Sequence, residues 1–320
     1  MRLSTYLKGF GAAALAATAS AGTALAQGLE IVGQPHDKNV GFQPASTSLA
    51  VEQQWLDHMI LYIITAIVIF VCALLLFVIF RFNSRANPVP RKFTHNTPLE
   101  VAWTLVPIVI LVFIGFFSLP TLFNQQEFPE GDVVIKVTGN QWYWSYEYPQ
   151  EGISFDSFLV DGAYEINDPA AGWDKGQPMS TRQTLDDVAI KKLEYFGYGR
   201  EQFLLATDTA MVVPVGKTVL LQITASDVIH SWKIPAFAVM QDAVPGRLAQ
   251  AWFRADREGI YFGQCSELCG KDHAFMPITV KVVSEEAYAK WVEQAKAGNV
   301  MLTADMMKPG QAPVQVAAAD

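Results

Sequence analysis

Two long apolar stretches constrain this chain more than any other feature. Met59 to Phe80 is 22 residues without a charged side chain, and Val101 to Leu119 is 19 more. Each is long enough to cross the hydrocarbon core of a bilayer as a helix. They predict a transmembrane hairpin over residues 55–123, with spans at about 59–80 and 101–119. A hairpin buried in a soluble protein is the alternative, but a composition that is 51% hydrophobic favours the membrane.

The charges between the spans predict how the hairpin is oriented. The connecting loop carries four basic side chains, Arg81, Arg85, Arg91 and Lys92. Because loops rich in Lys and Arg stay in the cytoplasm, the first span should run inward and the second outward. Both termini are then expected in the periplasm of a bacterial inner membrane.

The N-terminal segment has the pattern of a secretory signal. Residues 1–26 begin with Arg2 and Lys8, continue through an Ala-rich apolar core and end in Ala-Leu-Ala. The apolar run is short for a membrane span, so cleavage is predicted rather than a third anchor. Residues 27–54 should form an extended periplasmic arm.

After the hairpin the pattern changes to short strands separated by Gly, Pro and Asp turns, which predicts an all-β sandwich or barrel over 124–298. The expected strands include 133–137, 218–224, 249–254, 259–263 and 278–283. Residues 161–200 interrupt the pattern. We interpret them as a surface insertion with a short helix from Thr184 to Tyr195, Thr184 being its candidate N-cap. Ser284 should cap a last helix from Glu285 to about Ala297, and 299–320 resemble a disordered tail.

A cluster of metal-binding residue types lies near the end of the β region. Cys265, Cys269, His273 and Met276 fall within a dozen residues, and His230 lies upstream. Thiolates and thioethers are soft ligands that suit copper. A disulfide would leave the His and Met residues without a role, and a Cys₂His₂ zinc site would not use the Met. On residue types alone these readings and chance remain open beside copper.

The same residues resemble a known motif. His230, then Cys-x-Glu-x-Cys-x₃-His-x₂-Met at 265–276, is similar to the binuclear CuA motif of cytochrome c oxidase subunit II, and the neighbouring sequence agrees over roughly 45–297. The resemblance implies a cupredoxin-like Greek-key barrel. It implies that Cys265 and Cys269 bridge two coppers, that His230 and His273 each bind one, and that Met276 and the Glu267 carbonyl are weak ligands.

The resemblance implies further roles outside the copper ligands. The Glu267 carboxylate would help to bind a Mg²⁺ shared with subunit I. Trp142 would be the exposed residue through which electrons arrive from cytochrome c, although the alternative for this aromatic stretch is barrel core. Glu100 would lie at the entrance of a proton path, where the residues alone equally suggest an interfacial carboxylate. The docking face for cytochrome c would include Glu147, Asp156, Asp208 and Asp227.

Charge is consistent with a basic protein partner. Residues 124–298 hold 24 acidic and 15 basic side chains, a net of −9, so no nucleic-acid partner is expected. The resemblance implies the electron-accepting subunit of an oxidoreductase in the lipid membrane, which takes electrons from cytochrome c and passes them to the haem and CuB of oxidase subunit I. There, together with the other oxidase subunits, O₂ would be reduced and protons pumped. A quinol oxidase subunit lacks the copper ligands present here, and a nitrous oxide reductase domain lacks the two-span anchor. A membrane-tethered copper carrier is the alternative outside the enzymes.

Overall fold

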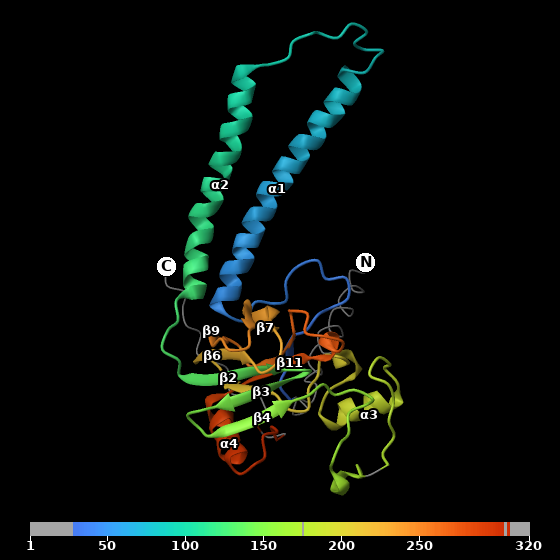
Figure 1. Cartoon of the computed structure of the whole chain (residues 1–320), viewed down its shortest axis with the longest axis vertical. Helices are drawn as coiled ribbons and strands as arrows, with labels where there is room; N and C mark the ends of the chain where they lie inside the picture. The colour runs from blue at the N-terminus through green and yellow to red at the C-terminus, as the bar shows by residue number, and fades with distance from the viewer. Residues whose placement is uncertain (1–27, 175, 304–305, 308–320) are drawn as a thin grey trace, which may run out of the picture.

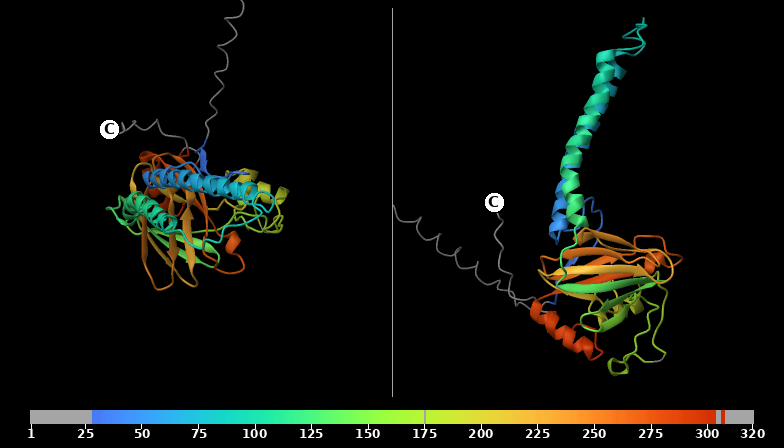
Figure 2. Two further views of the ribbon diagram at one scale, coloured as in Figure 1. Left: turned by 90° about the horizontal axis from the view of Figure 1, so that it is seen from above. Right: turned by 60° about the vertical axis from the view of Figure 1, so that its left-hand side comes forward.

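The chain folds into a helical hairpin and a β domain, shown in Figure 1 from a computed structural model. The structure describes residues 28–174, 176–303 and 306–307. The predicted signal segment 1–26 and most of the predicted tail lie outside the described residues. The two helices leave the same end of the β domain together (Figure 2).

Both helices are longer than the predicted spans. Helix α1 covers Ser48–Arg81 and α2 covers Thr97–Gln126. The Thr47 hydroxyl caps α1 by accepting a hydrogen bond from the Ala50 N–H at 3.0 Å. A helix of 34 residues is about 50 Å long, well beyond the ~30 Å hydrocarbon core. The predicted arm is therefore wrong at its end, since residues 48–54 form the first two turns of α1.

The base of the hairpin is attached to the β domain. The Thr47 hydroxyl donates to the Phe237 carbonyl at 2.9 Å, and the Ser46 N–H donates to the Ala236 carbonyl at 3.0 Å. Above this point the side chains of both helices are almost all exposed and apolar. Both helices are long and apolar enough to span a membrane. Exposed apolar surface on this scale requires lipid or partner helices.

The β domain is a sandwich. Its larger sheet has the order β4-β3-β2-β6-β9, and the facing sheet has the order β1-β10-β11-β5. The strands are β1 (Ile31–Gly33), β2 (Val133–Asn140), β3 (Tyr143–Tyr148), β4 (Ile153–Ser157), β5 (Met211–Pro214), β6 (Thr218–Ala225), β9 (Ala249–Arg254), β10 (Gly259–Gln264) and β11 (Pro277–Val283). A separate hairpin pairs β7 (His230–Ile234) with β8 (Val239–Ala243). The five predicted strands are present, and the arm adds β1, which the sequence analysis missed.

Alternation along the strands builds the core between the sheets. In β6 every second side chain is buried, and in β3 the buried positions are Trp144, Tyr146 and Tyr148. These three aromatics form core, as the simpler reading of this stretch predicted. Trp142 lies before the strand and is only partly buried. The core therefore encloses the aromatic side chains of β3 but not Trp142, the tryptophan just before the strand.

The insertion and the C-terminal helix lie outside the sheets. The insertion holds α3 (Asp187–Tyr195) and two short 3₁₀ turns, η1 (Pro169–Ala171) and η2 (Arg200–Gln202). Asp186 caps α3, accepting from Val188 and Ala189, so the prediction of Thr184 as the cap is wrong. A carboxylate favours the positive end of the helix dipole more than a hydroxyl does.

The C-terminal helix begins where it was predicted. The segment after it was predicted to be disordered, but its described part is ordered. Helix α4 (Glu285–Lys296) has Ser284 as its N-cap, as predicted. The Trp291 indole donates to the Val300 carbonyl at 2.8 Å, and Met306 is buried. The described part of the predicted tail, 299–303 with 306–307, is thus packed against the domain because its apolar side chains cover the core.

Candidate metal centre

The predicted ligands come from two segments. His230 is the first residue of β7, and the others lie in the loop between β10 and β11, which we call the metal loop (265–276). The loop contains a 3₁₀ turn, η4 (His273–Phe275), before β11 begins. The strands on either side are paired throughout their length, so both ends of the loop are fixed.

The predicted ligands form two similar halves around the two cysteine sulfurs, which are 3.8 Å apart. Cys265 Sγ lies 3.9 Å from His230 Nδ1 and 3.3 Å from the Glu267 carbonyl oxygen. Cys269 Sγ lies 3.6 Å from His273 Nδ1 and 4.0 Å from Met276 Sδ. Each thiol therefore has one imidazole and one weak donor beside it.

The His230 ring is held in a fixed orientation. Its Nε2 lies 2.9 Å from Asp227 Oδ1, which leaves Nδ1 facing Cys265. Trp144 packs edge-on against the ring at 5.9 Å between centroids. A β-carbon on Gly139 would come within 2.8 Å of the ring, so only glycine fits there. Carboxylate partners of this kind orient and strengthen histidine ligands. Sequence reasoning placed Asp227 on a docking face and missed this role.

The pKa values of the two thiols indicate that a cation between them would be stabilising. Burial raises the pKa of Cys265, but hydrogen bonds with His230 and with the backbone of Ser231 and Glu267 outweigh it and bring that pKa to about 7. Burial and the neighbouring Cys265 charge raise the pKa of Cys269 to about 12. The second thiolate is therefore unfavourable beside the first, and a bound cation would remove that cost.

The donor set suits copper better than zinc or a disulfide. The two cysteines are not joined as a disulfide. A tetrahedral zinc site uses four donors and has no need of a thioether, whereas six donors meet here, including the buried Met276. Two thiols, two imidazoles and a thioether form the soft set that copper prefers.

Trp142 contacts the metal loop directly. Its indole Nε1 donates to the Cys269 carbonyl at 3.3 Å, and the Gln141 side chain donates to the same oxygen at 2.8 Å. Lys271 lies over the indole at 5.4 Å. A partly exposed aromatic side chain is thus hydrogen-bonded directly to the backbone of a predicted ligand residue.

Comparisons with known proteins agree with this geometry. The family described as cytochrome c oxidase subunit II, periplasmic domain, matches residues 133–170 and 184–283. The transmembrane domain of the same subunit matches residues 35–121. Cytochrome c oxidase subunit 2 of Cereibacter sphaeroides is 59% identical over 305 residues, covering 95% of this chain and 96% of the relative. The chain belongs to the cytochrome c oxidase subunit II family.

More distant family members are similar over most of their length. Probable cytochrome c oxidase subunit 2 of Rickettsia bellii is 41% identical over 260 residues, covering 81% of this chain and 85% of the relative. The crystal structure of the periplasmic domain of subunit II from Bradyrhizobium japonicum is 40% identical, with a TM-score of 0.40, covering 54% of this chain and 99% of that one. The family is a subunit of cytochrome c oxidase, an oxidoreductase. The two apolar helices followed by a β sandwich agree with the fold class predicted from the sequence.

The four acids assigned to docking by resemblance differ in their surroundings. Glu147 and Asp156 are exposed; Glu147 pairs with Lys136 at 3.1 Å and Asp156 accepts from the Ser145 hydroxyl at 2.6 Å. Asp208 instead accepts internal hydrogen bonds from Phe158, Tyr164 and Thr209, and burial raises its pKa. Asp227 is also exposed, but its Oδ1 lies 2.9 Å from His230 Nε2. Glu147 and Asp156 are thus the two exposed acids of this group that lie outside the metal centre.

Glu100 and Glu267 lie far apart in the sequence and have different contacts. Glu100 is in the first turn of α2, where its carboxylate accepts from the Asn96 N–H at 3.2 Å. This contact stabilises the helix start, which was the simpler of the two readings. The Glu267 side chain is exposed while its carbonyl faces Cys265. Its carboxylate therefore points away from the thiols and is available to a hard cation.

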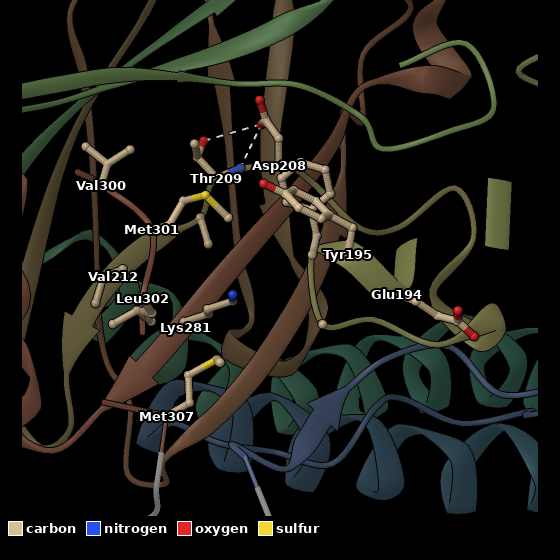
Figure 3. A pocket seen from close by; sticks show the side chains of 13 residues that line it. Glu194, Tyr195, Asp208, Thr209, Val212, Lys281, Val300, Met301, Leu302 and Met307 are labelled. Atoms are coloured by element: carbon tan, nitrogen blue, oxygen red, sulfur yellow. Dashed lines mark hydrogen bonds between the residues drawn. The ribbon is translucent and has the colours of Figure 1, made fainter. Parts of the chain in front are cut away.

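A cavity of about 170 Å³ lies outside the metal loop (Figure 3). It is bounded by α3, by β11 and by the packed C-terminal segment. Lys281 extends into it between Met301 and Met307, and its amine also lies 5.2 Å from the Tyr198 ring. None of the predicted ligands lines this cavity, so it lies outside the candidate metal centre.

Proposed function

We propose that this chain accepts electrons from cytochrome c at a binuclear CuA centre and passes them to subunit I of the oxidase. The observation that carries the proposal is the pair of matching half-sites around Cys265 and Cys269. When bound, two bridged coppers would share one electron, so that little rearrangement accompanies a change of oxidation state. Oxygen reduction and proton pumping would take place in the partner subunits.

The chain's own residues would prepare the site in distinct ways. His230 and His273 would present Nδ1, with Asp227 fixing the first ring. Met276 and the Glu267 carbonyl would supply weak donors that complete each half. Burial of both thiols excludes water and leaves no exposed position for a substrate. This arrangement suits electron transfer rather than oxygen chemistry.

The proposal extends to the exposed ends of the site. Trp142 would receive electrons because its indole donates to the Cys269 carbonyl. Glu147 and Asp156 would attract a basic cytochrome c, and the Glu267 carboxylate would bind Mg²⁺ together with subunit I. Glu100 would lie at the entrance of a proton path. The hairpin would lie in the inner membrane, with both termini of the chain in the periplasm.

The metal itself is tested by cysteine substitution. The purified chain should bind two coppers and show an electron paramagnetic resonance signal shared equally between them. Cys265→Ser or Cys269→Ser should abolish that signal, because a hydroxyl is a poor soft bridge. A wild-type chain that holds one zinc or a single localised copper would refute the assignment.

The proton path is tested separately. Glu100→Ala should slow turnover of the assembled oxidase while cytochrome c reduces copper at the normal rate. Normal turnover in a correctly assembled complex would leave Glu100 as the helix cap that its contact with Asn96 describes.

A further inference from the structure

The side chain of Arg182, in the insertion 161–200, contacts the metal loop. Its Nη1 lies 3.2 Å from Asp272 Oδ2, and its Nε lies 3.3 Å from Asp161 Oδ2. Asp272 directly precedes the ligand His273. Arg182 also falls in residues 171–183, which the family match leaves out. The contact is therefore a feature of this chain that the family motif does not include.

The insertion side of this bridge is rigid. The Asp161 side chain is only 2% exposed, and its Oδ1 accepts from the Ala163 N–H at 2.8 Å. The fully buried Lys192 of α3 donates to the carbonyls of Gly162 and Tyr164 at 2.9 and 2.7 Å. Burial raises the pKa of Asp161, and the charge of Arg182 offsets part of that rise. The guanidinium thus rests on a fixed carboxylate and not on a mobile loop.

The metal-loop side is the stretch that fixes His273. The Asp272 carbonyl accepts from the Phe275 N–H at 2.9 Å, which closes the short turn η4. Asp272 is held at one end by this turn and at its side chain by Arg182. A cavity of about 190 Å³ between the insertion and the loop is lined by Trp142, Arg182 and Phe275, among others. Arg182 therefore lines the same cavity as Trp142, the side chain that contacts Cys269.

We propose that Arg182 is a positioning residue that holds the His273 half of the metal loop in place by bridging Asp161 and Asp272. The inference rests on the proposed copper site and deepens it. A planar guanidinium can meet two carboxylates at fixed angles, which a lysine ammonium cannot do in the same way. Arg182 is 44% exposed, so the bridge contributes little to folding stability, and its effect is on geometry.

The test uses Arg182→Gln, Asp272→Asn and the double variant in the complete chain, purified with its oxidase partners. Arg200→Gln is the matched control, because Arg200 is an exposed arginine of the same insertion in a different turn. The readouts are the nitrogen hyperfine couplings of the copper signal and the rate at which a chelator removes copper. Neither depends on turnover.

We expect each single variant to alter one of the two nitrogen couplings, the one from His273, and to leave that from His230 unchanged. Copper loss should be about three- to tenfold faster, at or below the low end of outer-shell effects because the bridge is partly exposed. The double variant should be no worse than either single one, since both remove the same contact. Arg182→Lys should lose copper at a rate between those of the wild type and Arg182→Gln.

The outcomes separate this inference from the proposed function. Normal hyperfine couplings and copper retention in Arg182→Gln and Asp272→Asn would overturn the positioning role and leave the copper site intact. A wild-type chain without a shared copper signal would overturn both. If Arg182→Gln does not fold, Asp272→Asn keeps the Asp161 contact and decides the question alone.

Discussion

The indole Nε1 of Trp142 donates a hydrogen bond to the backbone carbonyl of Cys269 at 3.3 Å. The same indole is partly exposed and stands next to the open end of β3, so one side chain joins the solvent to the metal loop. Gly270, with φ +128°, follows Cys269, and a β-carbon there would lie 3.1 Å from the Trp142 ring. Close approach of ring and loop therefore depends on a glycine.

Substitution of this tryptophan should separate electron transfer from folding. Trp142→Gln should leave thermal stability, copper content and cytochrome c binding nearly unchanged, because the side chain is not enclosed by the core. Reduction of copper by cytochrome c, followed by stopped flow, should become much slower. Trp144→Gln is the contrasting variant. The Trp144 side chain is fully buried against His230, so its replacement should lower the free energy of unfolding by about 3–5 kcal/mol. A stable Trp142→Gln protein that is reduced at the wild-type rate would rule out this role.

Docking should depend on Glu147 and Asp156, the two exposed acids that lie outside the metal centre. Glu147→Gln with Asp156→Asn should lower the association rate with cytochrome c and weaken its dependence on salt, because exposed charges act over ~8–10 Å at moderate ionic strength. Asp208→Asn should instead act on stability, since that carboxylate is bonded internally. Glu286→Gln, on the exposed side of α4, is the control. Equal salt dependence in the double variant and the wild type would contradict the docking face.

An interaction could be predicted from the sequence when the residues that make it lie close together in the chain. Ser284 as a cap, the strand alternation and the motif around Cys265 are encoded within a few residues, and each could be predicted. The Asp227–His230 contact is local too, and a carboxylate three residues before a ligand histidine could have indicated it. The Arg182–Asp272 bridge joins residues 90 positions apart. The pairing of β1 with β10 depends on the same kind of distant contact, which no local pattern signals.

Gly139 should be sensitive to the smallest possible substitution. In Gly139→Ala the new β-carbon would meet the His230 ring at 2.8 Å, in a site where β2 and β7 leave no space. Overpacking of this kind costs about 1–3 kcal/mol, and any shift of the ring turns Nδ1 away from Cys265. Copper content per chain should fall, as metal analysis would show. Gly41→Ala, where a β-carbon meets nothing within 4 Å, should keep full copper. Full occupancy in Gly139→Ala would mean that the ring can move without losing the metal.

Lys281 should lower the stability of the domain near neutral pH. Burial lowers the pKa of this amine to about 8 from 10.5, and the amine lies 5.2 Å from the Tyr198 ring. The unfolded chain therefore binds more protons than the folded one between about pH 8 and 10.5, and the free energy of unfolding attributable to this group rises with pH across that window. Lys281→Met should be more stable than the wild type at pH 7, by at most ~3 kcal/mol for a shift of this size in a partly exposed side chain. The difference in melting temperature between the two should shrink as pH is raised through the window, while the exposed Lys191→Met control should show no such change. A wild type that is the more stable protein at pH 7 would show that contact of the amine with Tyr198 outweighs the cost of burying it.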